Sequence, residues 1–186
     1  MDRRELIDEL IKDTIQVRSD VKNLIDLGDE MINLKPTADQ WSVIECIEHL
    51  NIADAHYLHH FEVELGKAEL SKKDIFKPGF LGNYFVNAMK PRPDGKIPSP
   101  MKTLRKFRPD VTKQYDTIDR FLKDQDKLLD LLEKSSSFNL NKIKITSALG
   151  RIITFKLGDA FRFVIAHNQR HVKQMKNTIQ SLELVV

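Results

Sequence analysis

The chain has 186 residues, of which 41% are hydrophobic and 31% are charged, and its formal net charge is +3. This length and composition predict one folded domain over residues 1–186 and exclude an intrinsically disordered chain. The small net charge does not indicate a nucleic-acid partner, and no apolar run approaches the roughly 20 residues that a membrane-spanning helix needs.

The N-terminal sequence and the cysteine content favour a cytoplasmic protein. The first residues, MDRRELIDELIKDT, mix acids and bases, so we expect neither a signal peptide nor an acid-poor transit peptide. Cys46 is the single cysteine, which excludes an intrachain disulfide and agrees with a reducing compartment.

Two long helices are predicted in the first third of the chain. Apolar residues recur at helical spacing over residues 2–27, and Gly28 stands where a C-terminal stop is expected. After a loop, Ser42 and Glu45 form a capping box, in which each side chain accepts an amide hydrogen bond at the start of a helix. We expect this second helix to end near Gly66.

The middle of the chain predicts an irregular connection and a third long helix. Residues 71–109 hold most of the prolines, which indicates a long loop with one short helix at 81–89. Pro109 suits the first turn of the next helix, whose apolar stripe begins with Val111 and Tyr115.

The last third of the chain completes the predicted fold. Residues 138–157 alternate weakly in polarity, so a small hairpin or an extended crossover is expected. A fourth long helix is predicted from residue 158 to residue 182, with Asp159 as its N-cap. Four long helices with one long irregular connection predict an all-α protein, a four-helix bundle.

A basic segment extends from Lys90 to Arg108, with seven Lys or Arg residues and a single acid, Asp94. Because it lacks helical spacing and interleaved aromatic residues, a solvated loop is favoured and no nucleic acid is expected. Steering of an anionic partner is the alternative.

The histidines form the most informative pattern in the chain. His167 and His171 are four residues apart on the fourth predicted helix, so their rings point within about 40° of each other and can share a metal ion. On the second helix His49, His56 and His60 also face nearly one direction. Spacing alone does not choose between His49 and His56 as the third ligand.

Several other catalytic patterns are excluded. There is no HExxH sequence and no glycine-rich phosphate loop. A di-iron bundle is excluded because Glu45 stands four residues from His49, not three, and the fourth helix has no acid between its ends. Cys46, in an apolar turn, is expected to pack rather than to react. His59 points away from the other histidines and is expected to be solvated, and Asp54 is either a general base or a solvated acid.

Two motifs resemble those of a known family. The pattern W-S-x-x-E-x-x-x-H-L, from Trp41 to Leu50, is similar to the second-helix signature of the DinB-like proteins. The sequence AHNQRHVKQM is similar to their closing H-x-x-x-H helix, so the resemblance covers essentially the whole chain. It implies an up-down-down-up bundle with a three-histidine metal centre, and by motif position it selects His49, His167 and His171.

The same resemblance implies a range of functions. The superfamily contains YfiT-like metal-dependent hydrolases and S-transferases that use bacillithiol or mycothiol. A metal-dependent enzyme is therefore expected, with thiol transfer or a related detoxifying reaction slightly favoured over hydrolysis. The metal would be a divalent transition ion; zinc and nickel are favoured, although imidazole ligands do not identify it.

Further expectations concern the surroundings of the site. Gln174, one turn beyond His171, is a candidate contact for a metal-binding histidine or for the substrate, although a solvated or packing glutamine is favoured. The expected partners are a small-molecule substrate, such as a low-molecular-weight thiol, and a second copy of the chain in a homodimer, with no membrane. The alternative is a non-catalytic bundle that binds a small molecule or a partner protein and uses the histidines as polar core residues.

Overall fold

The computed structural model describes residues 1–92, 94–97, 102–110, 116–150 and 152–184. The elements in these ranges are, in chain order, α1 (Arg3–Ile25), α2 (Asp29–Asn33), α3 (Val43–Lys67), α4 (Phe80–Met89), the 3-10 helix η1 (Arg105–Phe107), α5 (Thr117–Ser135), β1 (Lys144–Thr146), β2 (Thr154–Lys156) and α6 (Leu157–Glu183). None of these helices is both long enough and apolar enough to cross a membrane.

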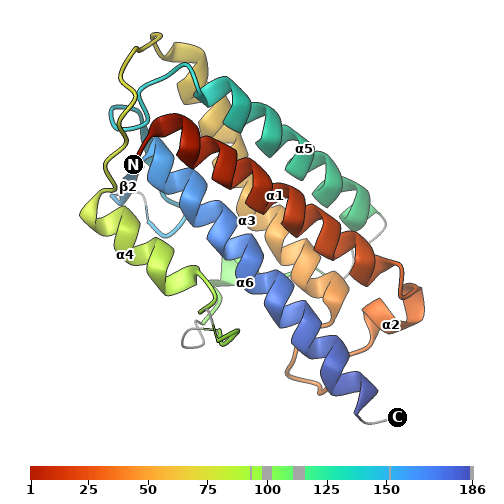
Figure 1. The fold of residues 1–186 in the computed structure, drawn as a ribbon. Helices are drawn as coiled ribbons and strands as arrows, with labels where there is room; N and C mark the ends of the chain where they lie inside the picture. The colour runs from red at the N-terminus through yellow and green to blue at the C-terminus, as the bar shows by residue number, and fades with distance from the viewer. Residues whose placement is uncertain (93, 98–101, 111–115, 151, 185–186) are drawn as a thin grey trace.

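The four long helices α1, α3, α5 and α6 form a bundle (Figure 1). Helix α1 packs between α5 and α6, and α3 packs against the same two helices from the other side. Helices α1 and α6 start at the end of the bundle where α3 and α5 finish, so the topology is the predicted up-down-down-up one. Helix α4 lies outside the bundle against α6.

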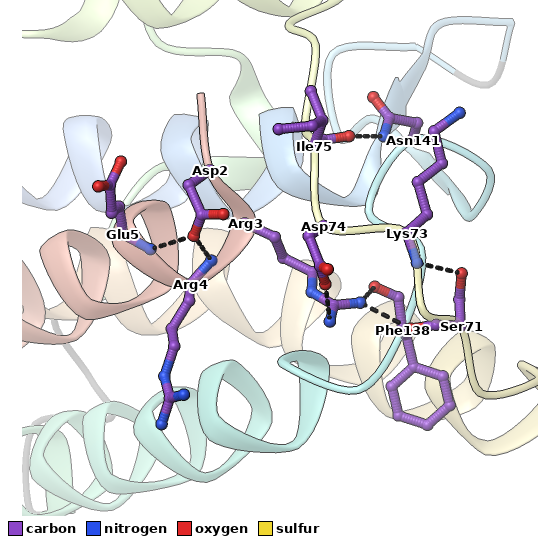
Figure 2. A network of polar contacts seen from close by, with 10 residues as sticks. All are labelled: Asp2, Arg3, Arg4, Glu5, Ser71, Lys73, Asp74, Ile75, Phe138 and Asn141. Carbon is purple, nitrogen blue, oxygen red and sulfur yellow. Dashed lines mark hydrogen bonds and ion pairs between the residues drawn. The ribbon is translucent and has the colours of Figure 1, made fainter.

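Polar contacts at this end of the bundle tie the start of α1 to the segments that follow α3 and α5 (Figure 2). The Arg3 guanidinium donates to the carbonyl oxygens of Ser71 and Phe138, at 2.9 and 3.1 Å, and pairs with the Asp74 carboxylate at 2.8 Å. One partly buried cation therefore joins three segments that are distant in the sequence.

The start of α3 has the predicted capping box. The backbone N–H of Glu45 donates to the Ser42 hydroxyl, and the backbone N–H of Ser42 donates to the Glu45 carboxylate at 2.9 Å. Lys35 pairs with the other carboxylate oxygen at 2.8 Å. These contacts fix where α3 begins and therefore which of its side chains face α6.

Two local predictions were wrong. The first loop contains the short helix α2. Asp159 is not the N-cap of α6, because β2 continues directly into this helix, which begins two residues earlier at Leu157. Asp159 lies inside the first turn and accepts a hydrogen bond from the backbone N–H of Gly79, at the start of α4, at 2.7 Å.

The other predicted elements agree with the structure where it describes them. Residues 80–89 form the short helix α4, and β1 and β2 pair as an antiparallel hairpin with Ile145 opposite Phe155. The predicted helix start at Pro109 precedes residues 111–115, which lie outside the described ranges and include Val111 and Tyr115 of the predicted apolar stripe. Helix α5 is described from Thr117.

A polar layer divides the apolar core of the bundle into two clusters. Each long helix contributes at least one buried polar residue at the boundary between the clusters, among them Thr14 on α1, Asp54 on α3, Gln125 on α5 and Asn168 on α6. Asp54 contacts both Asn168 and Gln125, so these three side chains lie at one level of the bundle, next to His167 in the sequence of α6.

Candidate metal centre

Two helices, α3 and α6, bring three histidines together. The capped start of α3 places His49 two turns into the helix, facing α6, and antiparallel packing sets it opposite His167 and His171. His49 and His171 are buried, at 5% and 7% exposure, His167 is half-buried, and all three border the same cavity.

The three rings point their Nε2 atoms at one another. His167 Nε2 lies 3.3 Å from His49 Nε2 and 3.1 Å from His171 Nε2. Two nitrogens bound to one tetrahedral zinc ion, each at about 2.0–2.1 Å, would lie about 3.3 Å apart. The imidazoles therefore already have the spacing of ligands to a common metal ion.

A backbone carbonyl orients the first of these rings. The Phe107 carbonyl oxygen lies 2.6 Å from His49 Nδ1, and because a carbonyl can only accept, Nδ1 carries the hydrogen. His49 Nε2 is then left with its lone pair directed at the other two rings. This arrangement, in which the second nitrogen donates to a carbonyl, is usual for histidines that bind metals.

The surroundings keep all three imidazoles neutral. Burial lowers the pKa of each ring. For His167, nearby His49 and Arg170 add to the effect of burial, and the pKa falls to about 3. Neutral imidazole is the form that binds zinc, nickel, copper and iron(II), so the cluster is ready to accept a cation at neutral pH.

A cavity of about 550 Å³ opens in front of the cluster. Trp41 forms part of its wall, with its ring 5.0 Å from that of His49, and Leu104 and Phe107 add apolar surface. Lys102 and Arg170 contribute cations, whereas Asp39 is the single acidic residue among the described residues of the lining. The volume is within the range of small-molecule sites.

Comparisons with known proteins agree with this fold. The sequence model of the DinB superfamily matches residues 14–175. The chain belongs to the DinB superfamily. A solved structure of YfiT from Bacillus subtilis, described as a probable metal-dependent hydrolase with an unusual four-helix bundle topology, matches with a TM-score of 0.57 at 10% identity, over 95% of this chain and 87% of that one. No curated protein matches significantly.

The other histidines of this DinB-superfamily chain lie elsewhere. His56 directs Nε2 at the Thr146 carbonyl of β1, 2.9 Å away, and does not reach the cluster. His60 packs beside His56, and His59 is exposed, as expected. Geometry therefore brings His49 to the pair on α6, as the resemblance implies.

Three predictions about neighbouring side chains have different outcomes. Gln174 lines the cavity. Its side chain lies close to His171 and opposes the lowering of the His171 pKa, although His171 Nδ1 has no hydrogen bond of regular geometry. Cys46 is fully buried, and burial raises the pKa of its thiol, so it packs as expected. Asp54 is buried and does not line the cavity, so neither role expected for it applies.

The polar layer beside the site was not predicted from the sequence. Asn168, the residue after His167, donates from Nδ2 to Asp54 Oδ2 at 2.9 Å. Burial raises the pKa of Asp54 to about 8, although the hydrogen bond from Asn168 opposes this. A signal was present, because Thr14 and Gln125 interrupt otherwise apolar helix stripes at core positions.

Proposed function

We propose that this chain is a metal-dependent enzyme in which His49, His167 and His171 hold one divalent transition-metal ion, with zinc and nickel the favoured ions. The observation that carries the proposal is the convergence of three Nε2 atoms at the spacing of ligands to one ion. A similar fold in a protein described as a probable metal-dependent hydrolase supports it.

The donor set suits catalysis better than a purely structural role. Three protein ligands leave a coordination position for water or substrate, whereas structural zinc sites use four. A bound ion would supply Lewis acidity, which lowers the pKa of a coordinated thiol or water. The Phe107 carbonyl holds His49 in the required tautomer, and the ring of Trp41 covers one side of the cluster.

We propose thiol transfer as the reaction, with a low-molecular-weight thiol as one substrate and an electrophilic small molecule as the other. Asp39 is the single carboxylate among the described residues of the cavity lining, and no glutamate lies there. Because the bound ion would lower the pKa of the thiol, the thiol could lose its proton to water and react as a thiolate, with no protein base. Lys102 and Arg170 would favour a substrate with negative charge.

Hydrolysis is the second candidate, and the likeness to YfiT favours it. The same three histidines would then activate a water molecule. The two reactions differ in a simple observable, because hydrolysis proceeds without any added thiol.

We further propose that the chain forms a homodimer, which light scattering would test.

The metal proposal is tested on untagged protein purified without chelators. We expect about one equivalent of transition metal by mass spectrometry, and a rise in melting temperature when zinc or nickel is added to stripped protein. At 100 times the dissociation constant, binding adds about 2.7 kcal/mol, which corresponds to about 5–10 °C for a chain of this size. His167→Ala should abolish both effects, whereas His59→Ala, on the exposed face of α3, should retain them.

The reaction is tested by following the loss of an electrophile, such as 1-chloro-2,4-dinitrobenzene, with bacillithiol, mycothiol or no thiol. We expect metal-dependent and thiol-dependent loss that His167→Ala removes. If stripped protein neither binds zinc or nickel nor is stabilised by them, the enzyme proposal is refuted and the chain is the non-catalytic bundle described above. Activity equal in His167→Ala and unaltered protein would also refute the proposal.

A further inference from the structure

We propose that His56 and His60, the pair in the second half of α3 and here called the outer pair, form a second and weaker metal site that favours Cu²⁺. The site is separate from the three-histidine cluster. His56 lies seven residues beyond His49 on the same helix, which corresponds to about 10 Å along its axis. A metal–nitrogen bond of about 2 Å cannot span that distance, so one ion cannot serve both groups.

The geometry of this pair matches that of the pair inside the cluster. The ring centroids of His56 and His60 are 4.5 Å apart with an interplanar angle of 62°. For His167 and His171, which have the same four-residue spacing, the values are 4.6 Å and 79°. The two pairs therefore hold their rings at nearly the same separation, which in the inner pair brings two nitrogens to 3.1 Å.

A hydrogen bond prepares one ring of the outer pair for metal binding. The Thr146 carbonyl oxygen of β1 lies 2.9 Å from His56 Nε2. Because the carbonyl can only accept, Nε2 carries the hydrogen and Nδ1 keeps a lone pair. His49 shows the same device with the nitrogens exchanged, since its Nδ1 faces the Phe107 carbonyl. Fixing the tautomer and the ring orientation in this way is how proteins prepare histidine ligands.

The second ring is available to an ion from solvent. His60 is half-buried, and within the described ranges it makes ring contacts with His56 and His59 but no hydrogen bond. Glu64 and Lys67, which pair with each other at 2.9 Å, both lie near the ring and act on it in opposite senses. Either nitrogen of the His60 ring can therefore bind a metal ion, in the matching tautomer, without breaking an existing hydrogen bond.

The number of ligands sets the chemistry expected of the site. Two imidazoles from the protein leave the remaining positions to water or to another small ligand, so binding should be weaker and more easily reversed than at the three-histidine cluster. Among divalent first-row ions, Cu²⁺ binds nitrogen donors most tightly. Copper is therefore the ion that such a pair should retain best.

The test is a copper titration of untagged protein in the His49→Ala/His167→Ala background, which leaves a single histidine of the three-histidine cluster. We expect one equivalent of Cu²⁺ to remain bound, with nitrogen hyperfine structure from imidazole in its electron paramagnetic resonance spectrum. Because this background lacks the cluster, failure of the proposed function and failure of the outer site are separate results.

Two variants and one control identify the ligands. His60→Ala and His56→Gln should each weaken copper binding by about tenfold or more, since even the loss of a group that merely orients a ligand costs about 10- to 100-fold. Glutamine retains an N–H that can donate to the Thr146 carbonyl, so the link between α3 and β1 is kept. His59→Ala removes an exposed histidine from the same helix and should leave binding unchanged.

Two results would overturn the proposal. One is that His60→Ala, shown by circular dichroism to be folded, binds copper with the same affinity as the background protein without this substitution. The other is an equal loss in His59→Ala, which would mean that exposed histidines bind copper independently of the pair.

Discussion

Asp54 offers a sharp test of the polar layer, because its carboxyl group should be neutral in the folded protein. Burial between α3 and α6 raises its pKa from 3.8 to about 8, and Asn168 donates to it at 2.9 Å. In the unfolded chain the same group should ionise near its ordinary pKa. Between these two values the folded state binds a proton that the unfolded state releases.

The sign of the pH dependence follows from this difference. Stability from Asp54 is fully present below about pH 4 and is lost as pH rises toward 8, because deprotonation favours the unfolded state. Each pH unit in this window is worth at most about 1.4 kcal/mol. Over pH 5–8 the unaltered chain should therefore lose up to about 4 kcal/mol relative to Asp54→Asn. The asparagine oxygen can still accept the hydrogen bond from Asn168.

The assay is urea unfolding of both proteins at several pH values, with a chelator present throughout so that bound metal does not contribute. Other titrating groups are common to both chains and cancel in the difference. Asp130→Asn, which removes an exposed acid on α5, should differ from the unaltered chain by no more than about 0.5 kcal/mol at every pH. A difference for Asp54→Asn that changes by less than about 1 kcal/mol over the range would show that Asp54 is ionised in the fold.

Three further predictions concern stability and share urea unfolding as the measurement. A Cβ on Gly158 would lie 2.6 Å from the ring of Phe76, so Gly158→Ala should cost about 1–3 kcal/mol of unfolding free energy. As the control, a Cβ on Gly66 meets no atom within 4 Å, so Gly66→Ala should be neutral or stabilise by up to about 1 kcal/mol. Equal effects would contradict the close approach. Ser42→Ala removes the cap of α3 and should cost about 0.5–2 kcal/mol; no loss would mean that Glu45 alone fixes the helix start. Arg3→Ala leaves partly buried carbonyls without a donor and should cost about 1–3 kcal/mol of unfolding free energy. Arg4 is exposed, so Arg4→Ala should cost less than about 0.5 kcal/mol. Similar losses in the two variants would refute the role given to the contacts in Figure 2.

The sequence predicted those parts of the fold that depend on local chemistry. The amphipathic stripes and the Ser42 capping box are set within a few residues, and they determined the long helices. Asp159 was misinterpreted because a residue with good N-cap chemistry can lie inside a helix when the preceding strand starts that helix earlier. The start of α6 depends on the hairpin that packs before it, which no local pattern reveals.

The same division applies to the candidate site. The spacing of His167 and His171 is local, and by itself it indicates that the two rings share a direction. The Phe107 carbonyl that orients His49 belongs to a segment 58 residues away along the chain. No spacing rule relates these two positions, because their contact depends on how the connection after α4 returns to the bundle.

The choice between His49 and His56 shows what helical periodicity leaves out. Periodicity gives the direction of a side chain around the helix axis but not its level along a neighbouring helix. Because α3 and α6 are antiparallel, moving from His49 to His56 moves the facing position on α6 back toward its start. There Tyr57 meets Phe163, with ring centroids 5.7 Å apart, so α6 offers a phenyl ring at that level instead of an imidazole. Convergence on one ion requires agreement in both direction and level, and of the histidines on α3 that share this direction, His49 meets both conditions with His167 and His171.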